Sequence, residues 1–168
     1  MHSLFSKASG LTHDVIGSAI EVHKDKGPGL LEPIYEWCLT MELGLRGYAT
    51  KSQDNVTIRY KQFRREYPLR YDLLVEGCLI VEVKASESVH PIHKAQLLSY
   101  MKLLDIPLGL IINFNEQKLT DGVSRLILPG ANLVLFNKRR LSERSNPPFA
   151  QLPPVQTNDR NQEVIFDS

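Results

Sequence analysis

The sequence predicts an α/β domain built on a mixed β-sheet flanked by helices, and three observations support this class. Apolar residues recur at helical spacing near the N-terminus and again after residue 88. Short β-rich runs separated by turn residues lie between and after those segments. The run LGLIINF (108–114) is continuously apolar and short, which is typical of a central strand buried on both faces.

Two helices are expected first. The helix over about 11–25 carries one apolar stripe, formed by Leu11, Val15, Ala19 and Val22. Gly27-Pro28-Gly29 ends it, because both residue types disfavour helix interiors. A second helix is predicted over about 31–46, and Pro33 fits its first turn. Its apolar side is predicted to consist of Ile34, Trp37, Cys38, Met41 and Leu45.

The strands and the third helix follow. Three antiparallel strands are predicted in VTIRY (56–60), YPLRYDLLV (67–75) and CLIVEVK (78–84). A helix is then expected from Ser88, its predicted N-cap, to about Leu104. Strands over 108–114, 123–128 and 132–136 complete the order α-α-β-β-β-α-β-β-β.

Composition limits the possible classes of protein. Twenty Lys and Arg against 19 Asp and Glu give a formal charge of +1, which excludes a polybasic tail binder and an acidic solubiliser. Two cysteines cannot supply a four-cysteine metal site, and free thiols favour the cytoplasm. No apolar run reaches the ~18–20 residues of a membrane span, so no membrane partner is expected. Residues 1–141 are predicted to form one domain, followed by a proline-rich extended or disordered tail over 142–168.

Charged residues interrupt two of the apolar strands. Asp72 lies within LRYDLLV, and Glu82 and Lys84 lie two residues apart in CLIVEVK, so both leave the same face of that strand. Charged groups at such positions are costly unless they are paired or bind a metal. These three residues are therefore candidates for a functional site.

The register of the hairpin decides whether these residues meet. A two-residue loop, Glu76-Gly77, would place Asp72 and Glu82 on opposite faces of the sheet. A three-residue loop over 76–78 would place Asp72 opposite Glu82. The same loop gathers Leu73, Val75, Leu79, Val81 and Val83 on one face, so we predict it.

Two carboxylates and an ammonium on one patch suit a metal-dependent hydrolase. Hard oxygen ligands in small number favour Mg²⁺, with Mn²⁺ as a possible substitute. Lys84 would hold or deprotonate the attacking water and stabilise developing charge. The alternative is a purely structural salt-bridged cluster, since a D…ExK pattern is common by chance.

Further candidates lie on the helices. Glu32 begins the second helix, where a carboxylate also compensates the helix dipole. His93, Gln96 and Tyr100 form one polar seam on the third helix, which is also the pattern of a solvated face.

The motifs GPGLLEPIYEWCL (27–39), RYDLLVEGCLIVEVKA (70–85) and HKAQLLSYMKLLDIPLGLIINF (93–114) resemble the GxxExxY protein family of the PD-(D/E)xK nuclease superfamily. The resemblance covers about residues 10–128 and implies a restriction-endonuclease-like core with Mg²⁺-dependent phosphodiester hydrolysis. It implies Glu32, Asp72 and Glu82 as metal-binding acids and Lys84 as the catalytic lysine. Gln96 and Tyr100 match the Gln-x-x-x-Tyr element of RecB-like nucleases, which positions nucleic acid and water. Tyr71 stands where the superfamily signature names a proline.

A basic segment lies between the first and second of these motifs and ends at the first residue of the second. Aromatic residues Tyr60, Phe63 and Tyr67 alternate with the basic residues Arg59, Lys61, Arg64, Arg65 and Arg70. Such a patch is expected to bind phosphates and stack on bases, although a solvated hairpin shows the same pattern. The expected function is DNA hydrolysis. The alternatives are a nucleic-acid- or partner-binding module on the same fold and a structural scaffold.

Overall fold

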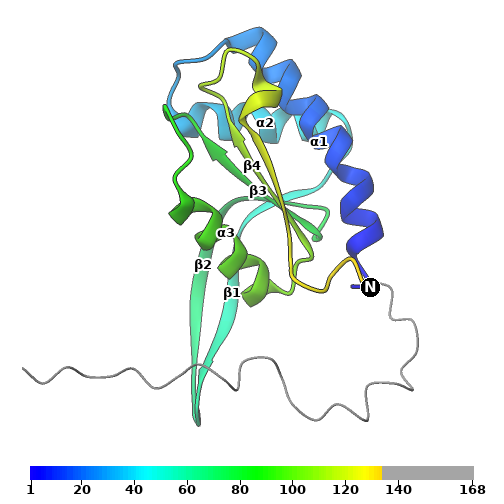
Figure 1. The fold of residues 1–168 in the computed structure, drawn as a ribbon, viewed down its shortest axis with the longest axis vertical. Coiled ribbons are helices and arrows are strands. Elements are labelled where there is room, and N and C mark those ends of the chain that lie inside the picture. Colours follow the sequence, from blue (N-terminus) through cyan, green and yellow to red (C-terminus); the bar gives the residue numbers. More distant parts are fainter. Residues whose placement is uncertain (134–168) are drawn as a thin grey trace, which may run out of the picture. The chain divides into compact units, whose positions relative to one another are not determined.

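The computed structural model describes residues 1–133. These residues form three layers, in which α1 and α2 cover one face of a β-sheet and α3 covers the other (Figure 1). The predicted tail over 142–168 and the predicted domain boundary at residue 141 lie outside the described residues.

The helices and strands follow the predicted order as far as the described residues extend. The helices are α1 (Phe5–Lys26), α2 (Glu32–Leu45), α3 (Pro91–Leu104) and the short 3-10 helix η1 (Leu119–Gly122). The strands are β1 (Thr50–Tyr60), β2 (Phe63–Val75), β3 (Leu79–Lys84), β4 (Leu108–Asn113) and β5 (Val123–Ile127).

The sheet is mixed, with the strand order β1-β2-β3-β4-β5. Only β3 and β4 are parallel, and α3 connects them as a crossover; the other neighbours are antiparallel. The two parallel strands are buried, as their apolar sequences require. The predicted fold class, an α/β domain with a mixed sheet flanked by helices and a restriction-endonuclease-like core, is confirmed.

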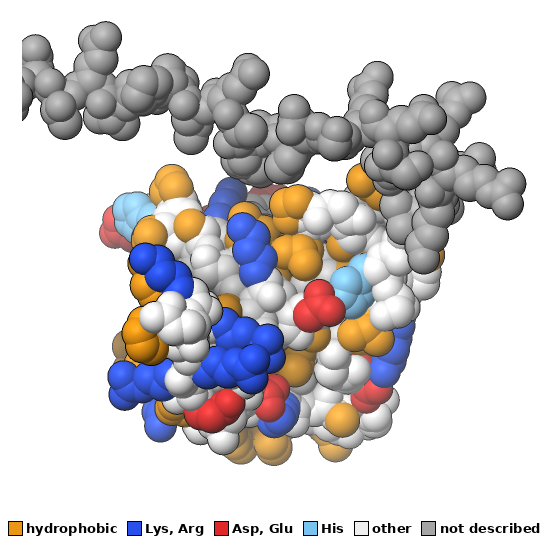
Figure 2. All heavy atoms as spheres, turned by 90° about the horizontal axis from the view of Figure 1, so that it is seen from below, with side chains coloured by type: hydrophobic (Ala, Val, Ile, Leu, Met, Phe, Trp, Pro, Cys, Tyr) orange, Lys and Arg blue, Asp and Glu red, His pale blue; other side chains and the backbone are white. Residues whose placement is uncertain are grey.

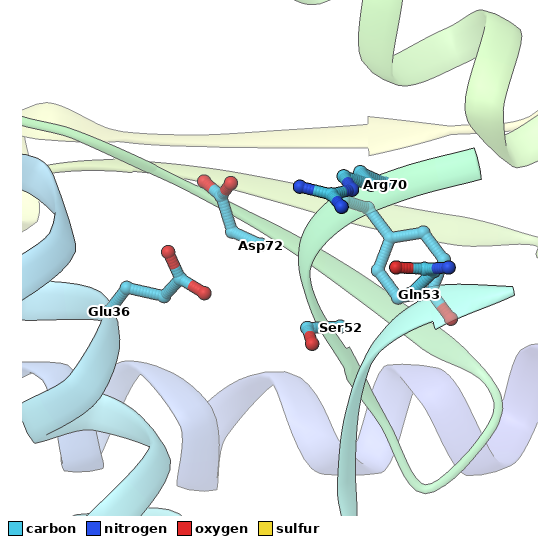
Figure 3. Close-up of a pocket in the computed structure, with 6 residues that line it drawn as sticks. Glu36, Ser52, Gln53, Arg70 and Asp72 are labelled. Carbon is cyan, nitrogen blue, oxygen red and sulfur yellow. The ribbon is translucent and has the colours of Figure 1, made fainter. Parts of the chain in front are cut away.

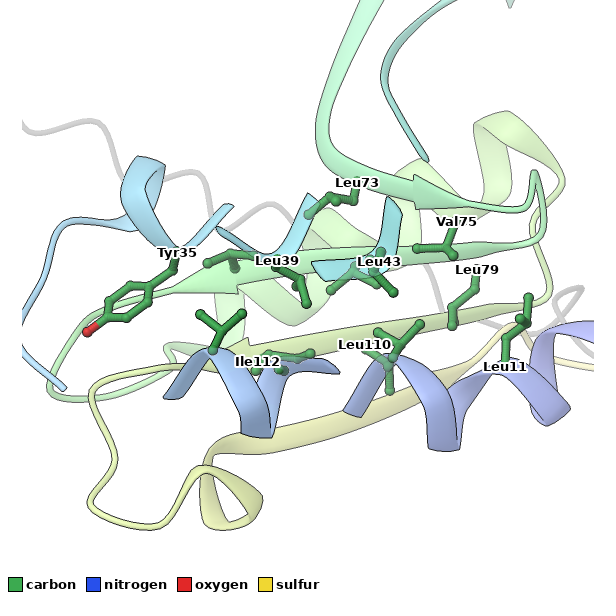
Figure 4. Close-up of a cluster of buried hydrophobic side chains, with 14 of the residues drawn as sticks. Leu11, Tyr35, Leu39, Leu43, Leu73, Val75, Leu79, Leu110 and Ile112 are labelled. Atoms are coloured by element: carbon green, nitrogen blue, oxygen red, sulfur yellow. The ribbon is translucent and has the colours of Figure 1, made fainter. Parts of the chain in front are cut away.

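Alternation along the strands divides the core into two clusters. Leu73, Val75, Leu79, Leu110 and Ile112 point toward α1 and α2, where they pack against Leu11, Leu39 and Leu43 (Figure 4). Residues of the opposite parity, Leu74, Ile80 and Ile111, pack against Leu97 and Met101 of α3. The predicted grouping of Leu73, Val75, Leu79, Val81 and Val83 on one face is confirmed.

Helix α3 approaches the sheet most closely at Gly109 of β4. A Cβ atom at that position would lie 2.9 Å from Met101 Sδ and 3.0 Å from Leu97 Cδ2. The side chains of Leu97 and Met101 therefore occupy the space that a side chain at residue 109 would need, and they pack directly on the backbone of β4.

The predicted apolar side of the second helix is wrong. Tyr35, Leu39 and Leu43 are its buried residues, whereas Trp37 is 63% exposed. Ile34, Met41 and Leu45 are also exposed, and Cys38 is half-buried. Because α2 is apolar on two sides, its periodicity does not show which side meets the sheet.

Three smaller expectations also need correction. Helix α1 begins at Phe5 rather than at residue 11. The N-cap of α3 is His90 rather than Ser88, because the residue before Pro91 takes an extended conformation. The predicted strand over 132–136 falls largely outside the described residues, and Asn132 and Leu133 are not in a strand.

None of the helices within residues 1–133 combines the length and the apolar character that a membrane crossing requires.

Candidate active site

The predicted register of the β2–β3 hairpin is confirmed. Leu73 pairs with Val81 and Val75 pairs with Leu79, so residues 76–78 form a three-residue loop. Glu76 and Gly77 have φ values of 52° and 65°, and this left-handed conformation suits a glycine in the loop. Continuing the same register places Asp72 opposite Glu82 on one face of the sheet.

Both acidic residues are tied to β3. Asp72 Oδ2 accepts a hydrogen bond of 2.7 Å from the backbone N–H of Val83. Lys84 Nζ donates to Glu82 Oε1 at 2.8 Å, and their side chains are 12% and 10% exposed. The hairpin therefore brings Asp72, Glu82 and Lys84 together at the end of a central strand.

Glu32 reaches the same end of β3 from the first residue of α2. Its Oε1 accepts a hydrogen bond of 3.2 Å from the backbone N–H of Ala85, the residue after Lys84. The turn before α2 is held by Tyr35, whose hydroxyl donates to Gly27 O at 2.6 Å and accepts from Leu30 N at 3.1 Å. The ring of Tyr35 stacks on Phe114 at 4.5 Å between centroids. The turn from Gly27 to Leu30, Glu32 and Tyr35 thus act as one structural unit, in which the tyrosine positions the acid.

The end of β3 is also held from β4. Asn113, which is buried, donates from Nδ2 to Ser86 O and accepts at Oδ1 from Ser86 N. Phe114 N donates to Lys84 O at 2.7 Å. These bonds fix the direction in which the chain leaves β3, and so the direction of Lys84.

Glu36 is a fourth acid that the sequence reasoning missed. It lies one helical turn after Glu32 and lines an open depression of about 460 Å³ together with Asp72 and Arg70. In Figure 3 the Glu36 side chain extends from α2 toward β2, and its carboxylate and that of Asp72 both lie beside this depression. The i, i+4 spacing from Glu32 was the available signal, because it places both acids on one side of the helix.

We call Glu32, Glu36, Asp72, Glu82 and Lys84 the acid–lysine site. Burial raises the pKa of Asp72 to about 6, and the neighbouring charge of Glu82 adds to the increase. Burial, followed by the charge of Glu82, also raises the pKa of Glu36. Burial lowers the pKa of Lys84, but the hydrogen bond and charge of Glu82 outweigh this, so its pKa lies above the usual value. Lys84 is therefore an ammonium at neutral pH, and the acids repel one another.

The donor set of the site suits a hard divalent cation. It offers carboxylate oxygens in excess over one ammonium. Burial and the neighbouring charge of Glu82 raise the pKa of Asp72, and a cation bound beside it would favour its ionised form. Within residues 1–133, no three His, Cys, Asp or Glu side chains are already arranged around a common ion position. The residues fit Mg²⁺ when solvent supplies the remaining ligands, as is usual for this ion.

The predicted elements on α3 are not joined to the acids by hydrogen bonds. Gln96 Nε2 donates to Tyr100 OH at 2.8 Å, and Gln96 is exposed. Among the hydrogen bonds of the described residues, none links either side chain to the acid–lysine site. His93, one turn before Gln96, has a buried Nδ1 without a hydrogen-bond partner in this part of the chain.

The basic residues lie on the β1–β2 pair. Arg70 lines the depression beside Asp72. Arg59, Lys61, Arg64 and Arg65 lie farther along the strands and are exposed. Tyr71, which replaces the proline of the superfamily signature, is buried and donates from its hydroxyl to Asp54 Oδ2 at 2.8 Å.

Comparison with known families agrees with this geometry. A sequence model of the PD-(D/E)XK nuclease superfamily matches residues 9–126, which include all five residues of the acid–lysine site. The chain belongs to the PD-(D/E)XK nuclease superfamily. No curated protein and no solved structure matches it.

Membership narrows the chemistry. PD-(D/E)XK proteins are generally nucleases that act on nucleic acids, and they usually use divalent metals. A hydrolase of phosphodiester bonds is therefore the class to which this protein's fold and sequence assign it.

Proposed function

We propose that this protein is a Mg²⁺-dependent nuclease of the GxxExxY family that hydrolyses phosphodiester bonds of DNA at the acid–lysine site. The observation that carries the proposal is the charge imbalance at the end of β3. Four carboxylates meet one ammonium there, and the pKa of Asp72 is raised to about 6. Like charges held this close are expensive without a cation, and binding sites often retain such strain.

Asp72 and Glu82 are the proposed metal ligands, with Glu32 as the third acid and Glu36 as a competing candidate. The ion, Mg²⁺ or its substitute Mn²⁺, would polarise a phosphoryl oxygen and lower the pKa of a bound water. Glu82 Oε1 accepts the hydrogen bond of Lys84, and the other oxygen of this carboxylate, Oε2, is the proposed ligand of the ion.

Lys84 is proposed to stabilise charge rather than to act as a base. Its pKa lies above the usual value, so the side chain carries its proton at neutral pH. The N–H groups of Lys84 that do not bond to Glu82 would donate hydrogen bonds to the phosphoryl oxygens, on which negative charge grows during hydrolysis. Gln96 and Tyr100 are proposed to position the nucleic acid and the attacking water.

A catalytically weak nucleic-acid- or partner-binding module on the same fold is the second candidate. The observation in its favour is the ion pair between Glu82 and Lys84, which satisfies both groups internally. The open depression between Glu36 and Asp72 argues against a closed, purely structural cluster. The two free cysteines, Cys38 and Cys78, support the proposed cytoplasmic location.

The test is digestion of labelled linear duplex, circular duplex and single-stranded DNA by the full chain, with Mg²⁺, Mn²⁺ or EDTA. The nuclease proposal predicts cleavage with either ion and none with EDTA. Lys84→Met should abolish cleavage, whereas the exposed control Lys118→Met should cleave as the wild type does. If the wild type binds DNA but cuts none of these substrates with either ion, the binding module is the correct function.

A further inference from the structure

The β1–β2 pair continues beyond the body of the domain as a two-stranded arm, residues 57–68. Figure 1 shows these strands extending away from all three helices. The pairing runs without interruption from Val56↔Tyr67 to Tyr60↔Phe63 at the tip. Val56 and Leu69 are buried against the α3 side of the core, whereas every β2 residue from Phe63 to Pro68 is exposed. The arm is therefore a ribbon exposed to solvent except at Ile58, which is partly buried against the α3 side of the core.

The arm is strongly basic. It contains four basic residues and one acidic residue, Glu66, whose carboxylate accepts a hydrogen bond from Thr57. None of the ion pairs within residues 1–133 involves a basic residue of the arm. Seen from the end toward which the arm points, Lys and Arg side chains gather beside hydrophobic ones (Figure 2).

One cross-strand pair of the arm is unfavourable without an anionic ligand. Arg59 and Arg64 are direct cross-strand partners, and like charges at such positions destabilise a sheet. At the tip, Tyr60 and Phe63 form an aromatic pair that is 67% and 62% exposed. The cross-strand aromatic pair stabilises the tip, but both rings remain largely exposed and the arginines repel each other, so these groups are available to a bound partner.

Both faces of the ribbon carry positive charge. Arg59 and Arg64 share one face, and Arg65, two residues from Phe63, lies on the other with the aromatic tip. A single strand bound along one face would leave the arginines of the opposite face unused. The walls of a duplex groove present phosphates on both sides of an inserted ribbon.

We propose that the arm enters the major groove of duplex DNA about one helical turn from the bond that the acid–lysine site attacks. Two strands ~4.8 Å apart with their side chains suit the ~12 Å major groove and not the ~6 Å minor groove. Nine residues separate Phe63 from Asp72 along β2, which is about 30 Å at ~3.3 Å per residue. One turn of B-DNA measures about 34 Å.

Arg70 continues the basic path to the site, because it lines the depression beside Asp72. The inference rests on the proposed function for the cleavage reaction at the acid–lysine site, and it adds the class of substrate. That class is duplex DNA with about ten base pairs beyond the cleaved bond.

The experiment measures binding without cleavage. The full chain in EDTA is titrated against labelled duplexes of 6, 12 and 24 base pairs and a 24-nucleotide single strand, over a range of salt concentrations. Arg59→Ser/Arg64→Ser is compared with Lys94→Ser/Lys102→Ser, which removes the same charge from exposed positions on α3. Circular dichroism and thermal unfolding check that each variant is folded.

We expect the arm variant to bind the 24-base-pair duplex at least about fivefold more weakly and to lower the salt slope by about two units. The α3 variant should stay within about twofold of the wild type. The 6-base-pair duplex should bind weakly to all three proteins, since it is too short to contact the acid–lysine site and the arm at the same time. Equal binding of the duplex by the two variants overturns the inference. The inference is also overturned if the wild type binds the single strand more tightly than the duplex and Tyr60→Ser/Phe63→Ser abolishes that preference.

The inference and the proposed function fail separately. Arm-dependent duplex binding by a protein that never cleaves DNA leaves the inference standing and refutes the nuclease proposal. Cleavage of the 6-base-pair duplex with Mg²⁺, unchanged in the arm variant, refutes the inference and leaves the nuclease proposal intact.

Discussion

Strand β2 has two halves with opposite relations to charge. In residues 73–75 it is buried and paired with β3, and charged neighbours such as Asp72 lie where water is scarce. In residues 63–68 it is paired only with β1 and exposed. A charge in the first half must be satisfied by named partners, whereas a charge in the second half is stabilised by solvent.

This difference shows how one strand serves two tasks. The buried residues fix the neighbouring Asp72 beside Glu82 of β3, at the cost of repulsion between the two carboxylates. The exposed half keeps arginines that no residue of the described chain neutralises, and it can therefore offer them to a ligand. Substitutions in the buried half should change both stability and chemistry, and those in the arm should change binding almost alone.

The largest effect is expected from Glu82→Ala. The variant should lose cleavage by at least about 1,000-fold, because it lacks a proposed ligand. It should also lose about 2–3 kcal/mol of unfolding free energy, because the buried Lys84 ammonium loses its hydrogen-bond partner. Urea denaturation and initial cleavage rates measure the two effects. Full stability with full activity would show that the ion pair is dispensable.

Asp72→Asn should stabilise the metal-free protein at pH 7 by about 1–3 kcal/mol. The pKa of Asp72 is about 6 in the folded protein and ~3.9 in the unfolded chain, so the folded state binds the proton more tightly. The stability of the wild type in EDTA should therefore rise as the pH falls through 6, and this gain should be complete below ~4. The variant lacks this gain, whereas the exposed control Asp121→Asn should retain it. A less stable variant at pH 7 would contradict the raised pKa.

Glu36→Gln and Glu32→Gln should differ in metal affinity. Burial and the charge of Glu82 raise the pKa of Glu36, so replacing it with a neutral amide removes repulsion and also a ligand candidate. A loss of about tenfold in Mn²⁺ affinity is expected if Glu36 binds the ion. Glu32→Gln can still accept the hydrogen bond from Ala85, and calorimetric titration of both variants decides which acid is the third ligand. The proposal that Glu32 is the third ligand predicts the larger loss for Glu32→Gln, and a larger loss for Glu36→Gln would give that role to Glu36.

The smallest effect is expected from Arg64→Thr. It removes the repulsion from Arg59 and introduces a residue with good β-propensity, so the unfolding free energy should rise by about 0.2–0.5 kcal/mol. DNA affinity should fall in the same variant. A loss of stability would mean that Arg64 has a structural partner in the arm.

Sequence reasoning succeeded where two independent patterns required the same answer. The loop over 76–78 satisfied both the apolar alternation and the acidic pair, so the register followed from parity. The alternation of side chains along a strand also predicted correctly that Glu82 and Lys84, two residues apart, lie on one face of β3.

Other features of the structure depend on contacts between segments that are distant in the sequence, and local sequence patterns did not predict them. Helix α2 has apolar residues on two sides, and only contact with the sheet selects Tyr35 and Leu39 over Trp37. The strands of the arm extend over polar residues because backbone pairing, not burial, holds them, so β1 begins at Thr50 rather than at residue 56. Glu36 was not predicted from the sequence, because its neighbours in the site come from β2 and β3.

Gly109 has a consequence for how this protein tolerates mutation. A methyl group there would meet Leu97 and Met101, and it would lift α3, together with the neighbouring Gln96, away from the sheet. Gly109 has no side chain that could take part in catalysis. It nevertheless sets the distance between α3 and the sheet, and the polar residues of α3 are proposed to position the substrate. In a selection for cleavage, glycine at 109 should therefore be as intolerant of replacement as the acids themselves, while selection for folding alone should accept alanine more readily.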